Sequence, residues 1–371
     1  MIFRRKKDIL SPLTQPTGTA AQTLTFRIKQ EARRLDGFIF SLAITPNATA
    51  PTGAAWGGYA GIVKEIRVKV QDVLGSRNAV QVSGIGLLSW TRNQIGRVDR
   101  YTKQSYASTG FTNAASEATS YINFFVPLRH PLVEEPFGNY LSLPLSSKFL
   151  GDDVIVEVDL WDIAAAGTVF TANAPSYPAS AAQLLTLVRE VDESYGYVPS
   201  ELRTDTFAPS SISNAAYEFT SNGYLTSALI QGLSAAALGN AVTRASTLSS
   251  GGNCRFEYGR EIWQRSNDVL DSALADLSAE SYPSATAGVI ASSALYARNW
   301  SNELMFDFFA DLPSNSAFSI ASVPNLYTQA LGGDKGRFVF NDFVASRSAM
   351  ITQHRFLPAN KNDIQALAAK L

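Results

Sequence analysis

GDDVIVEVDL, residues 151–160, has the pattern of a β-strand with one buried face. Its valines at 154, 156 and 158, followed by Leu160, recur at the two-residue period of a sheet and alternate with Ile155, Glu157 and Asp159. Near the other end of the chain, GGDKGRFVFNDF (332–343) again leads from glycine and aspartate into an alternating apolar run, here Phe338 and Phe340. The recurrence predicts one fold that is built twice in the chain.

Three further pairs of stretches support the duplication, and all four pairs keep the order of the chain. The added pairs are NFFVPL (123–128) with FDFFADL (306–312), GFIFSLAI (37–44) with GYLTSALI (223–230), and IVKEIRVKV (62–70) with CRFEYGREI (254–262). The shift between partners lies between 182 residues (333 − 151) and 192 residues (254 − 62), close to half of the 371 residues. We therefore expect two domains of the same kind, each large enough to bury its own core.

Composition limits the class of protein. Hydrophobic residues make up 46% of the chain, but no apolar stretch approaches the roughly 20 residues of a transmembrane helix. The net charge of −1 gives the chain no global reason to bind a polyanion, so we expect no specific nucleic-acid binding. Cys254 is the only cysteine, which excludes an intrachain disulfide and most thiolate metal sites. This usage fits a chain made in the cytosol.

The alternating runs predict an all-β protein. Short strands dominate both halves, and clusters of Gly, Pro, Asn and Ser separate them. With little helix between the strands, this order favours antiparallel sandwiches or barrels over βαβ units. Two helices are expected, at 266–277 and at 359–371, because their apolar residues fall on one helical face. The segment 164–180 is rich in Ala, Gly, Pro and Ser, and it is the candidate linker between the domains.

The N-terminus carries a basic quartet, Arg4, Arg5, Lys6 and Lys7. Such a cluster can begin a signal peptide, but the residues that follow, DILSPLTQPTGTA, lack the apolar region that export requires. Two interpretations stay open from the residues alone. The quartet is either part of a solvated tail or a segment that rests on an anionic membrane surface, where each basic residue gains about 1 kcal/mol.

Residue types that carry catalysis are few and poorly spaced. His130 and His354 lie near strand ends, and with Cys254 they match neither a zinc site nor a hydrolase nucleophile. Asp152 and Asp153 are expected to shape the turn before a strand rather than to hydrolyse a sugar. The glycine-rich stretches lack the order of a phosphate-binding loop. We therefore expect no catalytic residues, no metal site and no cofactor.

Three longer stretches resemble the major capsid proteins of tailless, membrane-containing bacteriophages. INFFVPLRHPLVEEPFGNYLSLPLSSKFLGDDVIVEVDLW (122–161) resembles the end of the first jelly roll in that family. LVREVDESYGYVP (187–199) resembles the entry into the second jelly roll, and GRFVFNDFVASRSAMITQHRF (336–356) resembles the closing strands. The resemblance is a pattern of strands and turns that covers most of the chain.

This resemblance implies an all-β fold of two tandem eight-stranded jelly-roll β-sandwiches with a few short helices, in the lineage of adenovirus hexon. The expected order is a basic arm (1–20), a first jelly roll (21–180), a second jelly roll (181–358) and a C-terminal helix (359–371). Three chains would form a homotrimer with a nearly hexagonal outline. Trimers made in the host cytoplasm would tile an icosahedral virion capsid together with penton or minor proteins. The basic quartet, Arg4 to Lys7, would face an internal membrane.

Two other classes remain as alternatives. A glycan-binding protein or glycosidase with two β-sandwiches would need paired acids in a cleft, and it need not form a trimer. An outer-membrane β-barrel would share the alternating aromatic strands. That class ranks lower, because no export signal is expected and the last residue, Leu371, is not aromatic. The capsid interpretation ranks first.

Overall fold

The computed structural model divides the chain into two compact units, which are described separately. The first comprises Met1–Pro199, Leu238–Asn240 and Pro283–Ser292, and the second comprises Ser200–Ala237, Ala241–Tyr282 and Ser293–Leu371. The residues that the structure describes are 6–45, 47, 61–95, 120–129, 141–164, 170, 172–178, 183–191, 196–210, 213–219, 224–234, 242–243, 248, 254–258, 261–265, 280–281, 284–286, 289–291, 295–296, 303–307 and 336–357. No helix among them is both long and apolar enough to span a bilayer.

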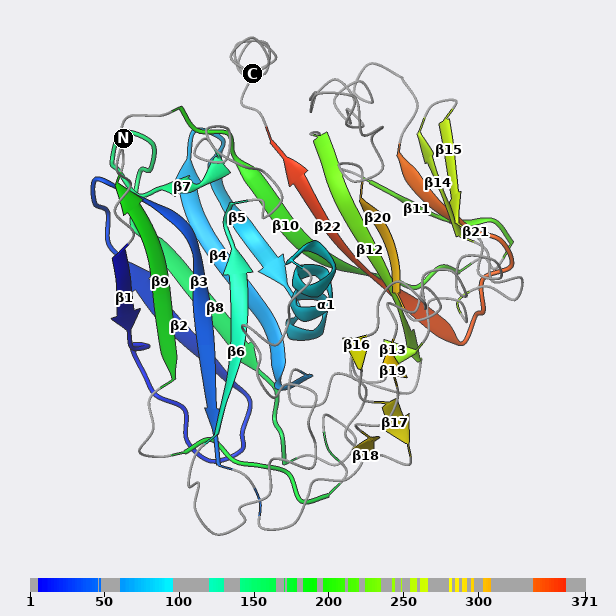
Figure 1. The fold of residues 1–371 in the computed structure, drawn as a ribbon, viewed down its shortest axis with the longest axis horizontal. Helices are drawn as coiled ribbons and strands as arrows, with labels where there is room; N and C mark the ends of the chain where they lie inside the picture. Colours follow the sequence, from blue (N-terminus) through cyan, green and yellow to red (C-terminus); the bar gives the residue numbers. More distant parts are fainter. Residues whose placement is uncertain are drawn as a thin grey trace. The chain divides into compact units, whose positions relative to one another are not determined.

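Two antiparallel sheets make up the first unit (Figure 1). One sheet has the order β1-β9-β3-β6, formed by β1 (Lys6–Leu10), β9 (Leu184–Val191), β3 (Arg33–Ile44) and β6 (Ser120–Pro127). The short β7 (Leu143–Pro144) pairs with the start of β3. The other sheet has the order β2-β8-β4-β5, formed by β2 (Gln22–Ile28), β8 (Val154–Leu160), β4 (Val63–Asp72) and β5 (Gly75–Val82).

The core of the first unit lies between these two sheets. The valines of β8 at 154, 156 and 158 are buried, as their alternation predicts. Phe26 of β2 meets Phe40 of β3 edge to face, with ring centroids 6.2 Å apart. Phe40 also stacks on Phe124 of β6 at 6.1 Å. Since these buried rings join strands of both sheets, the first unit is a β-sandwich.

The second unit is also built from two antiparallel sheets. One has the order β10-β22-β12-β20, formed by β10 (Ser200–Phe207), β22 (Arg347–Phe356), β12 (Tyr224–Ser234) and β20 (Glu303–Asp307), and the short β13 (Val242–Thr243) pairs with β12. The other has the order β11-β21-β14-β15, formed by β11 (Ala215–Glu218), β21 (Arg337–Phe340), β14 (Cys254–Tyr258) and β15 (Glu261–Arg265).

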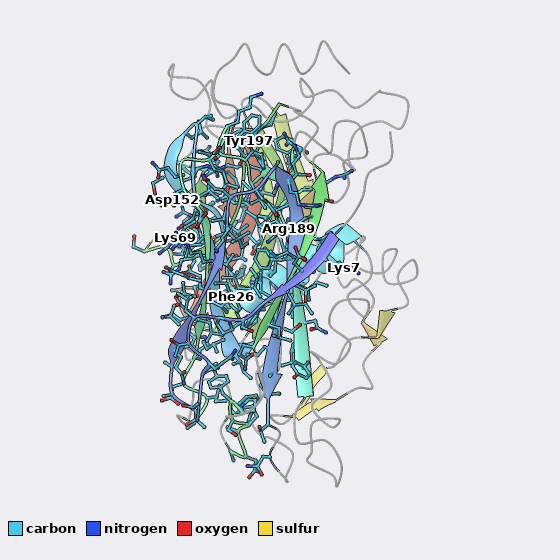
Figure 2. The ribbon with its side chains drawn as sticks, turned by 90° about the vertical axis from the view of Figure 1, so that its left-hand side faces the viewer. Lys7, Phe26, Lys69, Asp152, Arg189 and Tyr197 are labelled. Atoms are coloured by element: carbon cyan, nitrogen blue, oxygen red, sulfur yellow. The ribbon has the colours of Figure 1, made fainter. Side chains whose placement is uncertain are left out.

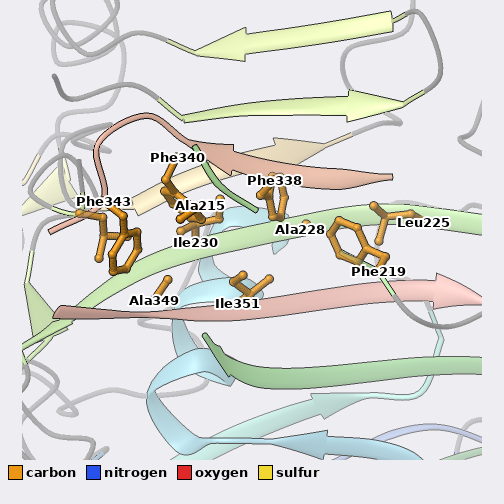
Figure 3. Close-up of a cluster of buried hydrophobic side chains, with 11 residues drawn as sticks. Ala215, Phe219, Leu225, Ala228, Ile230, Phe338, Phe340, Phe343, Ala349 and Ile351 are labelled. Atoms are coloured by element: carbon orange, nitrogen blue, oxygen red, sulfur yellow. The ribbon is translucent and has the colours of Figure 1, made fainter. Parts of the chain in front are cut away.

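A cluster of buried apolar side chains fills the second sandwich (Figure 3). Phe338 and Phe340 of β21 face Ala228 and Ile230 of β12 across the two sheets, and both phenylalanines are buried. The buried alternation that the sequence predicts for Phe338 and Phe340 is therefore confirmed. Two small two-stranded sheets complete the described strands: β16 (Glu280–Ser281) pairs with β19 (Leu295–Tyr296), and β17 (Ser284–Thr286) pairs with β18 (Val289–Ala291).

The principal strand pairings of the first unit recur in the second. Strands β1, β9, β3 and β6 correspond in order to β10, β22, β12 and β20, and strands β2, β8, β4 and β5 correspond to β11, β21, β14 and β15. Where the structure describes them, the four sequence pairs fall on equivalent strands, namely β8 with β21, β6 with β20, β3 with β12, and β4 with β14. Eight strands in two facing sheets of this order form a jelly roll. The prediction of an all-β chain with two tandem jelly-roll sandwiches is confirmed.

The strand pairing gives the jelly rolls limits that differ from those expected from composition. The first runs from Lys6 to Val191 and the second from Ser200 to Phe356, whereas the sequence analysis expects 21–180 and 181–358. β1 falls in the expected basic arm, yet it pairs with β9. β9 in turn belongs to the first unit, where its inward-facing leucines are buried. The last strand of a jelly roll pairs with the first strand of the same jelly roll. Composition near a domain boundary cannot show to which domain such a last strand belongs.

One helix, α1 (Gly84–Ile95), lies between β5 and β6 and packs against β4 and β6. It is not predicted from the sequence, because two glycines in its first turn weaken the helical signal. Ser83 caps the helix: its hydroxyl accepts a hydrogen bond from the Gly86 N–H at 3.0 Å, and its carbonyl accepts one from the Leu87 N–H at 2.9 Å. The helices expected at 266–277 and 359–371 lie outside the described residues.

Candidate functional site

Of the three side chains that could carry catalysis, the structure describes only that of His354. His354 is buried on β22, where its Nδ1 and the Thr226 hydroxyl share a hydrogen bond of 2.6 Å. Cys254 begins β14, and His130 lies outside the described residues. Within the described ranges, no three His, Cys, Asp or Glu side chains are grouped so that they could hold a metal ion. The histidine that can be placed therefore stabilises a strand.

Asp152 and Asp153 form the turn that precedes β8, as the sequence analysis expects. Asp153 accepts hydrogen bonds from the Gln30 N–H at 2.9 Å and from Arg27 Nε at 2.6 Å, and Asp152 accepts one from the Asp153 N–H at 2.7 Å. The Gln30 N–H, followed by the Arg27 guanidinium, stabilises the charged form of Asp153 and lowers the pKa of its carboxyl. A carboxylate held ionised in this way positions the chain and is a poor general acid.

Half of the basic quartet can be placed, and it lies on the edge of a sheet. Lys6 and Lys7 begin β1, whereas Arg4 and Arg5 lie outside the described residues. β1 is the terminal strand in the order β1-β9-β3-β6. Lys7 is exposed on the outward face of this strand together with Ile9, which is 64% exposed (Figure 2). The charges are evident from the sequence, but the strand that carries Lys6 and Lys7 is not.

The outer face of β8 and β4 carries charges of both signs. Arg67 lies 3.1 Å from Glu157 and 2.7 Å from Asp159, and Lys69 also pairs with Glu157. The Thr23 hydroxyl donates a hydrogen bond to Asp159 at 2.7 Å. These side chains reach solvent, so each pair contributes at most about 1 kcal/mol. Because positive and negative groups alternate, this face is not the basic stripe that would mark a nucleic-acid site.

A polar cluster lies within the second sandwich, where β10, β11 and β22 meet. Asp205 accepts hydrogen bonds from Arg203 Nε at 2.6 Å, from the Tyr217 hydroxyl at 2.7 Å and from Gln353 Nε2 at 3.0 Å. Burial, and then the charge of Asp205, raise the pKa of Tyr217 above its usual value. The phenol therefore stays protonated and acts as a donor. The cluster ties three strands together and leaves no group poised to react.

The described part of the chain thus offers surfaces rather than a reactive centre. Many of its charged groups are engaged in ion pairs and hydrogen bonds that hold strands and turns. The features left to interact with a partner are the edge strand β1, the faces of the sandwiches and the turns at their ends. One such turn, at residues 73–75, exposes apolar side chains that the sequence analysis does not single out. Its only signal is an apolar pair directly before a glycine, between two alternating strands.

Comparison with known proteins gives a likeness in structure and none in sequence. No protein-family model and no curated protein sequence matches the chain. The STIV major capsid protein, from Sulfolobus Turreted Icosahedral Virus, aligns with a TM-score of 0.59 at 11% identity, over 98% of this chain and 99% of that chain. The PBCV-1 virus capsid aligns with a TM-score of 0.53 at 10% identity, over 96% of this chain and 94% of that chain. The Faustovirus major capsid protein aligns with a TM-score of 0.51 at 10% identity, over 96% and 90%.

These alignments extend over nearly the whole chain, so they compare both jelly rolls together rather than one common sandwich. At such low identity the likeness shows a shared fold. The strand pairing leads to the same fold independently, since it gives two consecutive jelly rolls in one chain. The chain therefore has the double jelly-roll fold of these viral capsid proteins.

Proposed function

We propose that the chain is the major capsid protein of an icosahedral virus and that it assembles as homotrimers. The observation that carries this proposal is the repetition of one strand order in both units, together with full-length likeness to three capsid proteins. A single sandwich is a common scaffold for many functions. Two equivalent sandwiches in tandem, with no reactive centre in the described residues, suit a structural subunit of a capsid shell.

The duplication has a geometric use in this function. Three chains with two jelly rolls each present six similar sandwiches around a threefold axis. Such a particle has a nearly hexagonal outline and can pack into a hexagonal lattice, even though its true symmetry is threefold. Contacts of modest size, repeated by symmetry, would hold the shell. Penton or minor proteins would occupy the places where the hexagonal lattice closes. The protein would thus be a structural component of the virion capsid and not an enzyme.

Contact with an internal membrane is a further part of the proposal. The quartet Arg4, Arg5, Lys6 and Lys7 supplies four positive charges within one short segment, and anionic lipid attracts such segments. The exposure of Lys7 and Ile9 on one face of β1 supports this role, since a cation beside an aliphatic side chain suits the headgroup region.

The mass of the purified protein in detergent-free buffer, measured by light scattering, tests the proposal. A homotrimer has a mass of about 120 kDa, three times the 40.0 kDa of the chain. Trimers that form closed shells or hexagonal sheets in electron micrographs would support the capsid function. A stable 40.0 kDa monomer that binds glycans would overturn it in favour of the two-sandwich glycan-binding alternative.

A further inference from the structure

The hairpin between β4 and β5 exposes two adjacent aliphatic side chains at its tip. Val73 is 59% exposed and Leu74 is 41% exposed. Gly75 follows with a φ of 96°, a backbone conformation that favours glycine. We call residues 73–75 the hairpin tip. Two neighbouring exposed aliphatic side chains are unusual in a solvated hairpin turn, because polar residues usually occupy such turns.

The tip is held by buried charges. The side chain of Asp72 is fully buried and pairs with Arg77, whose Nη2 lies 2.7 Å and whose Nε lies 3.0 Å from Asp72 Oδ2. The other oxygen of Asp72 accepts a hydrogen bond from the Leu74 N–H at 2.9 Å. Tyr197 adds a hydroxyl next to the same pair. The ion pair fixes both strands and the backbone of the turn, so the exposure of Val73 and Leu74 is built into the fold.

Exposed lysines stand on the segments that are bonded to this hairpin. The Gly151 N–H donates to the Gln71 carbonyl at 2.8 Å, and Gln30 Nε2 donates to the Leu150 carbonyl at 2.9 Å. Lys148 belongs to the same turn as Leu150, and Lys29 precedes Gln30; both lysines are exposed. Nearby, Asp153 is paired with Arg27, which leaves Asp152 as the exposed acid on the described part of this end.

Lys6 and Lys7, the described half of the basic quartet, begin β1 on the side nearer to this end of the first sandwich. β1 and β3 are each antiparallel to β9, so they run parallel to one another. The start of β3 is hydrogen-bonded to the 141–151 segment through Arg33 and Leu145. The end of β4 is bonded to that segment as well. The lysine-bearing turns and the hairpin tip therefore belong to one end of the sandwich, and β1 begins on the side that faces this end. Figure 2 shows Tyr197 near this end, with Lys7 and Phe26 farther from it.

We propose that the hairpin tip inserts Val73 and Leu74 into the headgroup region of an anionic lipid bilayer, while Lys29 and Lys148 contact lipid phosphates. The inference rests on the proposed membrane contact and assigns it a surface beyond the basic quartet. An exposed aliphatic pair, with exposed cations on the segments that are hydrogen-bonded to its hairpin, has the chemistry of interfacial insertion. The tip is too small to supply by itself the roughly 800 Å² per partner of a specific protein interface.

Vesicle flotation of the full-length protein tests the inference, with vesicles of phosphatidylcholine alone and of phosphatidylcholine mixed with phosphatidylglycerol. We expect V73S/L74S to lower the partition coefficient on the anionic vesicles about tenfold, since two aliphatic side chains no longer leave water. We expect K29E/K148E to abolish the preference for anionic vesicles. The matched control is Y121S. Tyr121 is 44% exposed but pairs with Ala43 near the far end of β3, so its loss should leave partition unchanged.

The outcomes separate this inference from the proposed function. Wild-type partition by V73S/L74S would overturn the role of the tip. If V73S/L74S instead lost the 120 kDa species along with lipid binding, the tip would be a contact between copies of the chain, and the inference would be wrong. Trimers that build shells but do not float with anionic vesicles would overturn the inference and leave the capsid function standing. A monomer that binds anionic vesicles, and that loses this binding in V73S/L74S, would support the inference and overturn the trimeric capsid function.

Discussion

Arg189 and Arg355 occupy equivalent positions in the two jelly rolls. Arg189 on β9 pairs with Leu35 of β3, and Arg355 on β22 pairs with Leu225 of β12. In each sheet the register shifts by one residue directly after that leucine. Both arginines are buried and face the interior of their sandwich. A shared register shift opposite a shared buried cation is much more specific than alternating strands, and it supports a duplication of one ancestral sandwich.

Each arginine is neutralised by an acid from the first strand of its own jelly roll. Arg189 pairs with Asp8 of β1 at 3.3 Å and also with Glu31, and Arg355 pairs with Glu201 of β10 at 2.6 Å. The last and first strands of each sandwich are thus joined inside the fold by an ion pair. A buried pair of this kind costs desolvation, so it contributes to the register of the strands more than to net stability.

Removal of one partner of the Arg355–Glu201 ion pair should lower the free energy of unfolding more than removal of both partners. We predict that R355M lowers the free energy of unfolding by about 3 kcal/mol, because Glu201 is left with an uncompensated charge. R355M/E201Q should recover at least a third of that loss. Urea denaturation gives both values. As a control, R67M removes an exposed cation from the outer face of β4 and should cost less than about 1 kcal/mol. Equal stability of R355M and the double variant would argue against the pairing.

Gly37 should not tolerate a methyl group. A Cβ there would lie 2.7 Å from the Val126 carbonyl oxygen and 3.2 Å from the Phe125 ring, in a strand whose register is already fixed by the shift after Leu35. We expect G37A to cost about 2 to 3 kcal/mol, measured by thermal or urea unfolding. G151A is the matched control: its nearest contact, at 3.1 Å, is the flexible Gln71 side chain, so it should cost less than about 1 kcal/mol.

The face of β8 can be tested by two neighbouring substitutions. Val156 is fully buried between Phe26 and Val68 on the adjacent strands. V156D would place an unpaired charge in the core, and we expect it to cost more than about 4 kcal/mol and to yield aggregated protein. I155D points to the opposite face, between Arg27 and Lys69, and should leave soluble expression unchanged. Folded, soluble V156D would mean that the face is assigned wrongly.

Strands with a clear apolar alternation could be predicted from the sequence, and strands defined by their partners could not. β8 and β21 repeat their pattern because both lie against a sandwich core. β10, SELRTDTF, is polar at most positions because its side chains join the Arg203–Asp205 cluster, so it carries little periodic signal. β1, KKDIL, resembles a solvated tail until β9 pairs with it. Long-range pairing, rather than local preference, makes these segments strands.

One of the two candidate surfaces could be predicted from the sequence, and the other could not. The basic quartet is visible as a run of charge, although its attachment to the edge strand is not. The hairpin tip is hidden, because Val73 and Leu74 extend the apolar character of β4 and would be taken as core. Their exposure depends on the burial of Asp72, which forces the chain to turn at that point. A sequence pattern cannot report which acid of a strand will be buried.

Stability of the second unit should fall at alkaline pH. The pKa of Tyr217 is raised above its unfolded value of 10.0, so its contribution is fully present below pH 10 and is lost as the pH rises from there towards the folded value. Urea denaturation between about pH 9 and about pH 12 should show this decline. Y217F should decline less, because it lacks this phenol. Tyr177 and Tyr197, whose pKa values are also raised, belong to the first unit and account for the part of the decline that remains. An equal decline in Y217F would rule out Tyr217 as a source.

Charge reversal of the basic quartet tests membrane contact separately from folding. Lys7 is exposed, and the ion pair between Asp8 and Arg189 is formed by two residues that the charge reversal leaves unchanged. R4E/R5E/K6E/K7E should therefore keep the wild-type trimer mass and unfolding midpoint. Each reversed residue removes about 1 kcal/mol of attraction to anionic lipid and adds repulsion, so flotation with anionic vesicles and the yield of membrane-containing particles should both fall sharply. The neutral variant R4Q/R5Q/K6Q/K7Q should be intermediate if charge is the cause. Wild-type particle yield from the reversed variant would exclude the quartet as a membrane contact, and the hairpin tip alone would then have to account for any binding.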